Sequence, residues 1–382
     1  MRTSTWICVL CSLLLCGCRG EVVVYPPEEE QHGETQLTDA LGFYLLNEGN
    51  MGSNKATLDY YDFTSATYRR NIYAEANPNV AKELGDVGND LKIYGGRLYA
   101  VINCSNKVEV MDARTCRRIG QIDVPNCRYL RFHGSEGYLT SYAGPVVIKP
   151  DYEQLGYVAR FDTATLAITG ECLVGFQPDE LEIAGGKLYV ANSGGYMVPN
   201  YENTVSVIDL TTFTETKRIP VAVNLHHLRA DRHGQLWVSS RGDYYNTPSR
   251  LYCIDTQTDQ VTDSVDMAVS NFWLDGDSLY CYSTEWSYID METKPSHNYC
   301  IIDVKSHRPV TDNFITDGTD QKIKTPYGIS VHPLTKDIYV TDAKNYVTPG
   351  TLWCFSPEGE ARWSVRTGDI PAHFAFLYKS GQ

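Results

Sequence analysis

The chain has 382 residues, of which 42% are hydrophobic and 12% aromatic, and its formal net charge is -14. This composition supplies ample material for a packed core. The acidic balance argues against a nucleic-acid surface, because clustered Lys and Arg are needed to neutralise phosphate groups.

The first residues predict a targeting segment. Arg2 precedes an apolar run that ends at Leu15, and such a short run is typical of a signal peptide and not of a membrane-spanning helix. The letters LCGC that close the run resemble a bacterial lipobox, although Cys16 stands where a small residue is usual. We expect residues 1–17 to be a lipoprotein signal peptide and Cys18 to be lipidated. An ordinary secretory signal that is cut elsewhere is the alternative.

The segment after the signal peptide, residues 18–40, is polar and acidic and is interrupted by Pro26 and Pro27. This composition is typical of a flexible chain, so we expect a lipid-anchored flexible tether that holds the folded body off the membrane. No later segment is long and apolar enough to span a bilayer.

A strand of one type recurs along the rest of the chain. Its seven copies are separated by roughly 40 to 60 residues. They read GFYLLNEG, RLYAVIN, GYLTSY, KLYVANS, QLWVSS, SLYCYS and DIYVTD. Most copies follow another apolar strand and a tight turn, and precede a third strand that ends in Asp and then a fourth. Four short antiparallel strands, repeated seven times, predict an all-β fold, a seven-bladed β-propeller over residues 41–382. A β-helix or a sandwich is the structural alternative.

The two ends of the propeller segment complement each other. The stretch IPAHFAFLYK, from Ile370, has the pattern of a first strand with no blade after it. The unit that begins at Gly42 lacks a first strand of its own. We therefore expect the C-terminal strand to close the ring end to end, which removes exposed sheet edges.

The cysteines fit this fold without implying chemistry. Cys253 and Cys354 fall at the same strand position as Val207, where side chains pack between blades, and buried free cysteines are common. Disulfides remain possible, but their pairing cannot be deduced from the sequence, and no CxxC spacing indicates zinc.

Long loops rich in aromatic residues point to the functional face. In a propeller blade, the loop between the second and third strands opens on the same face as the link into the next blade. These loops are long here, whereas those of the opposite face are short. Loops that carry function on a rigid scaffold explain this asymmetry. The alternative is that these are surface loops whose sequences have varied without serving a function. The loop aromatics that we expect to contact a ligand are Tyr196, Tyr244, Tyr245, Trp286 and Tyr346.

The links between blades predict an inner ring of polar residues at the top of the central channel. This ring mixes hydrogen-bond donors, acceptors and both charge signs. Together with the aromatic rim, it suits a large, uncharged or zwitterionic ligand with many hydrogen-bonding groups. The candidate ligand contacts in the ring are Asp90, Arg128, Tyr129, Glu180, His227, Phe272, Tyr327 and His373.

No catalytic motif is present: the sequence has no serine elbow, HExxH, Walker loop or Rossmann glycine pattern. Asp179 and Glu180 resemble paired acids, but a solvated rim or a strand-capping pair is the commoner meaning at a link. His226 and His227 are adjacent near a strand start, where neighbouring side chains point in opposite directions, so we do not expect them to share a metal ion. The sequence favours a binding protein without a catalytic cofactor over an enzyme.

The lipobox, the opening repeat NEGNMGSNKATLDYYD and the unit GGKLYVANSGG…NTVSVIDLTTFTETKRIPV resemble the YVTN/YncE-like propeller lipoproteins of Bacteroides-type bacteria, and among them the BtuG-type propellers. The resemblance covers about the whole mature chain, from Leu41 onward. It implies an outer-membrane protein, lipid-anchored at the cell surface, that binds cobalamin (vitamin B12) and related corrinoids. It also implies delivery to a TonB-dependent transporter of the BtuB type. The repeat itself carries little functional specificity.

Two other functions fit the same residues. A glycan-binding surface lipoprotein would also expose aromatic side chains, because sugars stack on them. A lactonase-type hydrolase would hold a divalent metal at the channel mouth, for which Asp90, Asp179, Glu180 and Asn271 are available. A structural or adhesive role is the remaining possibility. A bond from histidine to cobalt is not needed for capture of a corrinoid at the surface.

Overall fold

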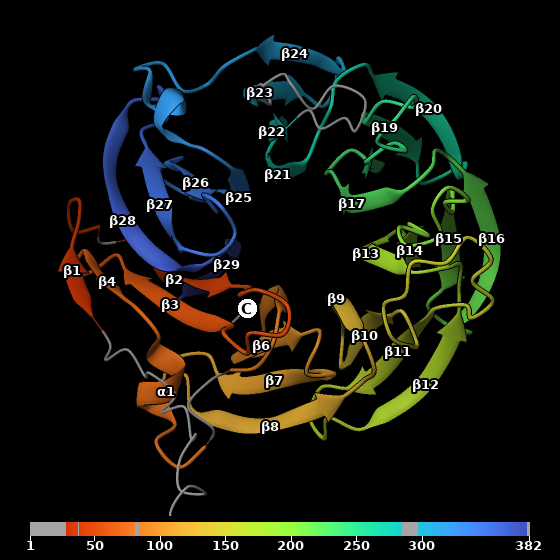
Figure 1. Ribbon diagram of the computed structural model, residues 1–382, viewed down its shortest axis with the longest axis horizontal. Helices are drawn as coiled ribbons and strands as arrows, with labels where there is room; N and C mark the ends of the chain where they lie inside the picture. Colours follow the sequence, from red (N-terminus) through yellow and green to blue (C-terminus); the bar gives the residue numbers. More distant parts are fainter. Residues whose placement is uncertain (1–27, 37, 81–83, 285–296, 380–382) are drawn as a thin grey trace, which may run out of the picture.

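The computed structural model describes residues 28–36, 38–80, 84–284 and 297–379, which form seven antiparallel sheets arranged as blades around a central axis (Figure 1). This confirms the predicted all-β, seven-bladed propeller. The described residues also contain the short helix α1 (Ile72–Ala76) and the 3-10 turn η1 (Thr319–Lys322). No helix in the described part of the chain is long and apolar enough to cross a membrane.

The first blade takes its strands from both ends of the chain. Outward from the axis, it consists of β29 (Pro371–Tyr378), β2 (Ala40–Asn47), β3 (Thr57–Asp62), β4 (Thr67–Arg69) and β1 (Glu29–Gln31). Because β29 pairs with β2 along its length, the predicted closure by the C-terminal strand is confirmed.

The other six blades follow in chain order, each with its first strand innermost. The second blade has β5 (Gly88–Tyr94), β6 (Arg97–Ile102), β7 (Lys107–Asp112) and β8 (Arg118–Asp123). The third has β9 (Cys127–His133), β10 (Glu136–Ser141), β11 (Tyr157–Asp162) and β12 (Ile168–Leu173). The fourth has β13 (Pro178–Ala184), β14 (Lys187–Asn192), β15 (Thr204–Asp209) and β16 (Thr214–Pro220).

The remaining blades repeat this order. The fifth has β17 (Leu225–Ala230), β18 (Gln235–Ser240), β19 (Arg250–Asp255) and β20 (Gln260–Val265). The sixth has β21 (Asn271–Asp275), β22 (Ser278–Thr284), β23 (His297–Asp303) and β24 (Arg308–Thr311). The seventh has β25 (Pro326–Val331), β26 (Ile338–Asp342), β27 (Pro349–Phe355) and β28 (Ala361–Asp369).

In the described residues, the core consists of seven hydrophobic clusters, and each cluster fills the space between two neighbouring blades. Alternating apolar residues on both faces of each strand produce this pattern, because a blade packs against a neighbour on either side. Cys253 and Cys354 are buried in two of the clusters, as their strand position predicted. The eight cysteines in the described residues are all free.

Most inner strands change their pairing register close to the channel entrance. In six of the seven blades, the ladder between the innermost strand and the next one shifts at this end; the strand β21 is regular. Such a β-bulge leaves one residue unpaired and breaks the alternation of side chains. Consecutive link residues can therefore face the channel together.

The segment expected as a tether differs from that expectation where the structure describes it. Glu29–Gln31 form β1, which pairs with β4 at the outer edge of the first blade. Arg70 anchors this strand through an ion pair of 2.7 Å with Glu30. Backbone pairing on an open sheet edge needs no apolar pattern, so composition did not reveal it. Residues 1–27, with the expected signal peptide and Cys18, lie outside the described residues.

Deleting residues 371–382 is expected to abolish the cooperative unfolding transition. The deletion removes β29 with its buried side chains, of which Phe374 alone accounts for about 3–5 kcal/mol when it is truncated to alanine. A typical domain has only about 5–15 kcal/mol of stability in total. Thermal melting followed by circular dichroism measures the effect, and a chain that ends at Lys379 is the control. A cooperative transition at the control's temperature would contradict the role of β29 in closure.

Candidate functional site

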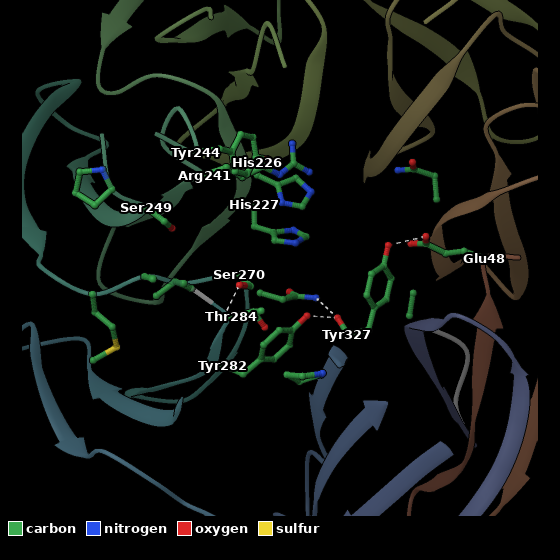
Figure 2. A pocket seen from close by; sticks show the side chains of 18 of the residues that line it. Glu48, His226, His227, Arg241, Tyr244, Ser249, Ser270, Tyr282, Thr284 and Tyr327 are labelled. Atoms are coloured by element: carbon green, nitrogen blue, oxygen red, sulfur yellow. Dashed lines mark hydrogen bonds between the residues drawn. The ribbon is translucent and has the colours of Figure 1, made fainter. Parts of the chain in front are cut away.

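The inner strands open at one end of the propeller into a cavity of about 1040 Å³ (Figure 2). Its wall is formed by the links that precede the inner strands and by loops between second and third strands. These are the two sets of segments that the sequence predicted on one face. Among the described residues, six tyrosines contribute to the wall: Tyr129, Tyr244, Tyr245, Tyr282, Tyr327 and Tyr346.

Eight of the thirteen candidate ligand contacts line this cavity. They are Arg128, Tyr129, His227, Tyr244, Tyr245, Tyr327, Tyr346 and His373. Tyr245 and Tyr346 lie at the rim, where they are 50% and 45% exposed. The cavity therefore has an aromatic rim above a mixed polar wall.

The other five candidates do not line the cavity. Asp90, Glu180 and Phe272 are buried, with at most 2% of each exposed, so the structure does not place them where a ligand in the cavity would touch them. Tyr196 is half-buried outside the lining. Trp286 lies outside the described residues.

Asp179 is fully buried beneath the cavity, and its negative charge pairs with two arginines of the cavity wall. Its carboxylate lies 3.3 Å from Nε of Arg128 and 3.2 Å from a terminal nitrogen of Arg241. It also accepts a hydrogen bond of 2.7 Å from the hydroxyl of Tyr142. Arg128 in turn lies over the Tyr142 ring. The carboxylate thus fixes both guanidinium groups at the wall.

Glu180 holds a second ionic cluster together. It contacts Arg131 at 2.7 Å and Arg229 at 3.4 Å. Burial raises the pKa of Glu180, but Arg229, the hydrogen bond from His227 and Arg131 outweigh it and hold this pKa well below its usual range. Asp179 and Glu180 are therefore buried counter-ions of arginines, and not the solvated rim that their link position suggested.

His226 and His227 point the same way, contrary to the expectation of opposite directions. Their ring centroids lie 3.7 Å apart, and both residues line the cavity (Figure 2). The cause is the register shift between Leu225 and Leu228, which interrupts the alternation at these two positions. His226 Nε2 lies 3.0 Å from the hydroxyl of Tyr129, and His227 Nδ1 lies 2.9 Å from Glu180.

The opposite wall is organised around Glu48. One carboxylate oxygen accepts a hydrogen bond of 2.8 Å from the Tyr327 hydroxyl (Figure 2). The other lies 3.0 Å from Nε2 of His373. Burial, followed by the charge of Glu48, raises the pKa of Tyr327 well above its usual value. The Tyr282 hydroxyl and the Asn271 amide both donate to the Tyr327 carbonyl. The bond to Glu48 holds the Tyr327 ring at the wall, and the bonds from Tyr282 and Asn271 hold its backbone.

The family described as a domain of unknown function, DUF5074, matches residues 41–353. The chain belongs to this family. Among solved structures, it is similar to hydrazine synthase of Kuenenia stuttgartiensis, with 17% sequence identity and a TM-score of 0.56. The similarity covers 77% of this chain and 90% of that chain. At this identity it shows the fold alone. No match was found among curated proteins.

Sequence reasoning missed three charged residues of the DUF5074 cavity: Glu48, Arg241 and Asp266. Glu48 and Arg241 each lie directly after the second strand of their blade, in the letters NEGN and SRGD. In a propeller, the residue that follows a second strand lies close to the channel, and this position was the available signal.

Proposed function

We propose that this DUF5074 propeller is a lipid-anchored outer-membrane protein that binds vitamin B12 and related corrinoids at the channel mouth. It passes them to a TonB-dependent outer-membrane transporter and catalyses no reaction. The observation that carries the proposal is the cavity of about 1040 Å³ with its aromatic and polar wall. Sites for drug-sized ligands occupy roughly 300–1,000 Å³, so this one suits a ligand at or above that size.

The chemistry of the wall matches a corrinoid. A corrin is a broad plate edged with amides. The tyrosine rings offer apolar faces for the plate, and Asn89, Asn271 and the histidines offer donors and acceptors for the amides. The charged lining residues are balanced: Arg128 and Arg241 against Glu48 and Asp266. A balanced wall favours a neutral or zwitterionic ligand over a strongly charged one.

Anchoring and delivery rest on the resemblance of residues 1–17 and Cys18 to a lipoprotein signal and of the chain to BtuG-type propellers. The cavity face adds support for a protein partner. Met51, Ile148 and Val347 expose 67%, 72% and 66% of their surface there, in loops of three different blades. Apolar side chains exposed on the same face as a binding site suit contact with a partner.

Glycan binding is the second candidate, because Tyr245 and Tyr346 are half-exposed at the rim, where a sugar ring can stack. A lactonase-type site has less support. The acids available for it, Asp90, Asp179 and Glu180, are engaged by lysine and arginine. Among the residues that the structure describes, no group of three His, Cys, Asp or Glu side chains is placed to hold a metal ion.

Gel filtration with cyanocobalamin tests the proposal. The chain from Arg19 onward contains every described strand, and the vitamin is coloured, so co-elution is visible directly. We expect stoichiometric colour in the protein peak, and none when the protein is first unfolded in denaturant. If all colour elutes at the free-ligand volume while the protein stays folded, the corrinoid proposal is wrong. Calorimetric titration with surface oligosaccharides would then test the glycan alternative.

A further inference from the structure

The hydrogen bond between His227 and Glu180 fixes the tautomer of this histidine. Glu180 is ionised, because it forms ion pairs with Arg131 at 2.7 Å and with Arg229 at 3.4 Å. An ionised carboxylate only accepts hydrogen bonds, so the proton lies on Nδ1 of His227, 2.9 Å away. The backbone N–H of Leu228 donates to the same carboxylate oxygen. In the neutral ring, the lone pair therefore lies on Nε2.

That lone pair is available to the cavity. His227 lines the cavity wall, and no group within the described ranges forms a hydrogen bond with its Nε2. The neighbouring His226 differs, because its own Nε2 is engaged by the Tyr129 hydroxyl at 3.0 Å. Both rings extend from the wall into the open space (Figure 2). A neutral imidazole with one nitrogen on a carboxylate and the other in a cavity is the arrangement that orients a metal ligand in proteins.

The protein does not complete a metal site around this nitrogen. In the described part of the chain, no three His, Cys, Asp or Glu side chains are grouped to hold an ion. Apart from Glu180, the charged groups that act on His227 are the cations Arg229 and Arg241. A bare cation would be repelled by them. A metal that reaches His227 therefore has to bring its other ligands with it, as the metal of a chelate does.

We propose that Nε2 of His227 is an axial ligand to the cobalt of corrinoids whose axial position is exchangeable. This inference rests on the proposed function, since it needs a corrinoid in the cavity. With aquacobalamin, the bond between cobalt and water breaks, the bond between cobalt and Nε2 forms, and the water leaves. The imidazole supplies both electrons of the new bond, so cobalt stays Co(III). The proton on Nδ1 stays in the hydrogen bond to Glu180. Cyanocobalamin, whose cyanide does not exchange, binds through the remaining contacts alone.

Absorption spectroscopy tests the bond. Wild-type protein is mixed with aquacobalamin, and the spectrum is compared with that of aquacobalamin in free imidazole. We expect the bound spectrum to match the imidazole reference, and we expect no change for cyanocobalamin. The variant His227→Asn keeps a donor near the position of Nδ1 and removes Nε2, so it should lose the shift. His133→Ala, at an exposed site outside the cavity lining, should keep it.

Dissociation rates provide a second readout. Aquacobalamin should leave the wild-type protein at least about tenfold more slowly than cyanocobalamin, and the two rates should become equal in His227→Asn. An unshifted aquacobalamin spectrum, or a shift that persists in His227→Asn, would overturn the cobalt bond while cyanocobalamin co-elution still supports corrinoid binding. If neither cobalamin co-elutes with the folded wild-type protein, the proposed function itself fails.

Discussion

Replacing Arg131 with methionine is expected to lower the free energy of unfolding by about 3–5 kcal/mol. The Arg131 side chain is 13% exposed and lies 2.7 Å from Glu180, 3.0 Å from Glu182 and 3.8 Å from Asp90. These acids come from the inner strands of the second and fourth blades, so the guanidinium group of the third blade ties three blades together. Methionine fills similar space but leaves the buried carboxylates without this partner.

Urea denaturation followed by tryptophan fluorescence measures this loss. The matched control is Arg232→Met, the same chemical change at an arginine whose side chain is 60% exposed and pairs with Asp277. Exposed ion pairs contribute little, so its urea midpoint should stay close to that of the wild type. Equal midpoints for both variants would show that the buried cluster is not a major source of stability.

Replacing Tyr327 with alanine is expected to weaken cyanocobalamin binding about 30-fold or more, which corresponds to about 2 kcal/mol. The ring lies at the cavity wall, packs edge-on against Tyr346 with 5.9 Å between centroids, and is held through its hydroxyl by Glu48. A fixed aromatic ring contributes apolar contact at little cost in conformational entropy. Tyr327→Phe keeps the ring and loses only the bond to Glu48, so a smaller loss of about 1 kcal/mol is expected.

Isothermal titration or competition with labelled cobalamin measures the affinity of both variants. Tyr94→Ala is the matched control, because Tyr94 stacks on Phe132 at the far end of β5, away from the cavity. Its affinity should equal that of the wild type. If Tyr327→Ala binds as tightly as the wild type, or if Tyr94→Ala loses as much affinity as Tyr327→Ala, the corrinoid does not bind against this wall.

The sequence by itself determined the fold and its closure. Each blade is specified locally, because the alternation of apolar residues and the turn residues between strands repeat within every unit of the chain. The first unit lacks an inner strand and the chain ends in a surplus one, and pairing these two removes an edge. The faces of the loops follow from the strand order alone, so the location of the cavity was also predictable.

Only the tertiary structure decided which side chains form the cavity wall. Asp90 and Glu180 were predicted as ligand contacts, but partners about forty to fifty residues away, on neighbouring blades, bury them. Bulges in the inner strands turn His226 and His227 to the same side, which no strand period predicts. The strand β1 pairs through backbone groups that every residue carries, so its polar sequence gave no sign of it. Local patterns set the strands, whereas contacts between blades set the chemistry of the site.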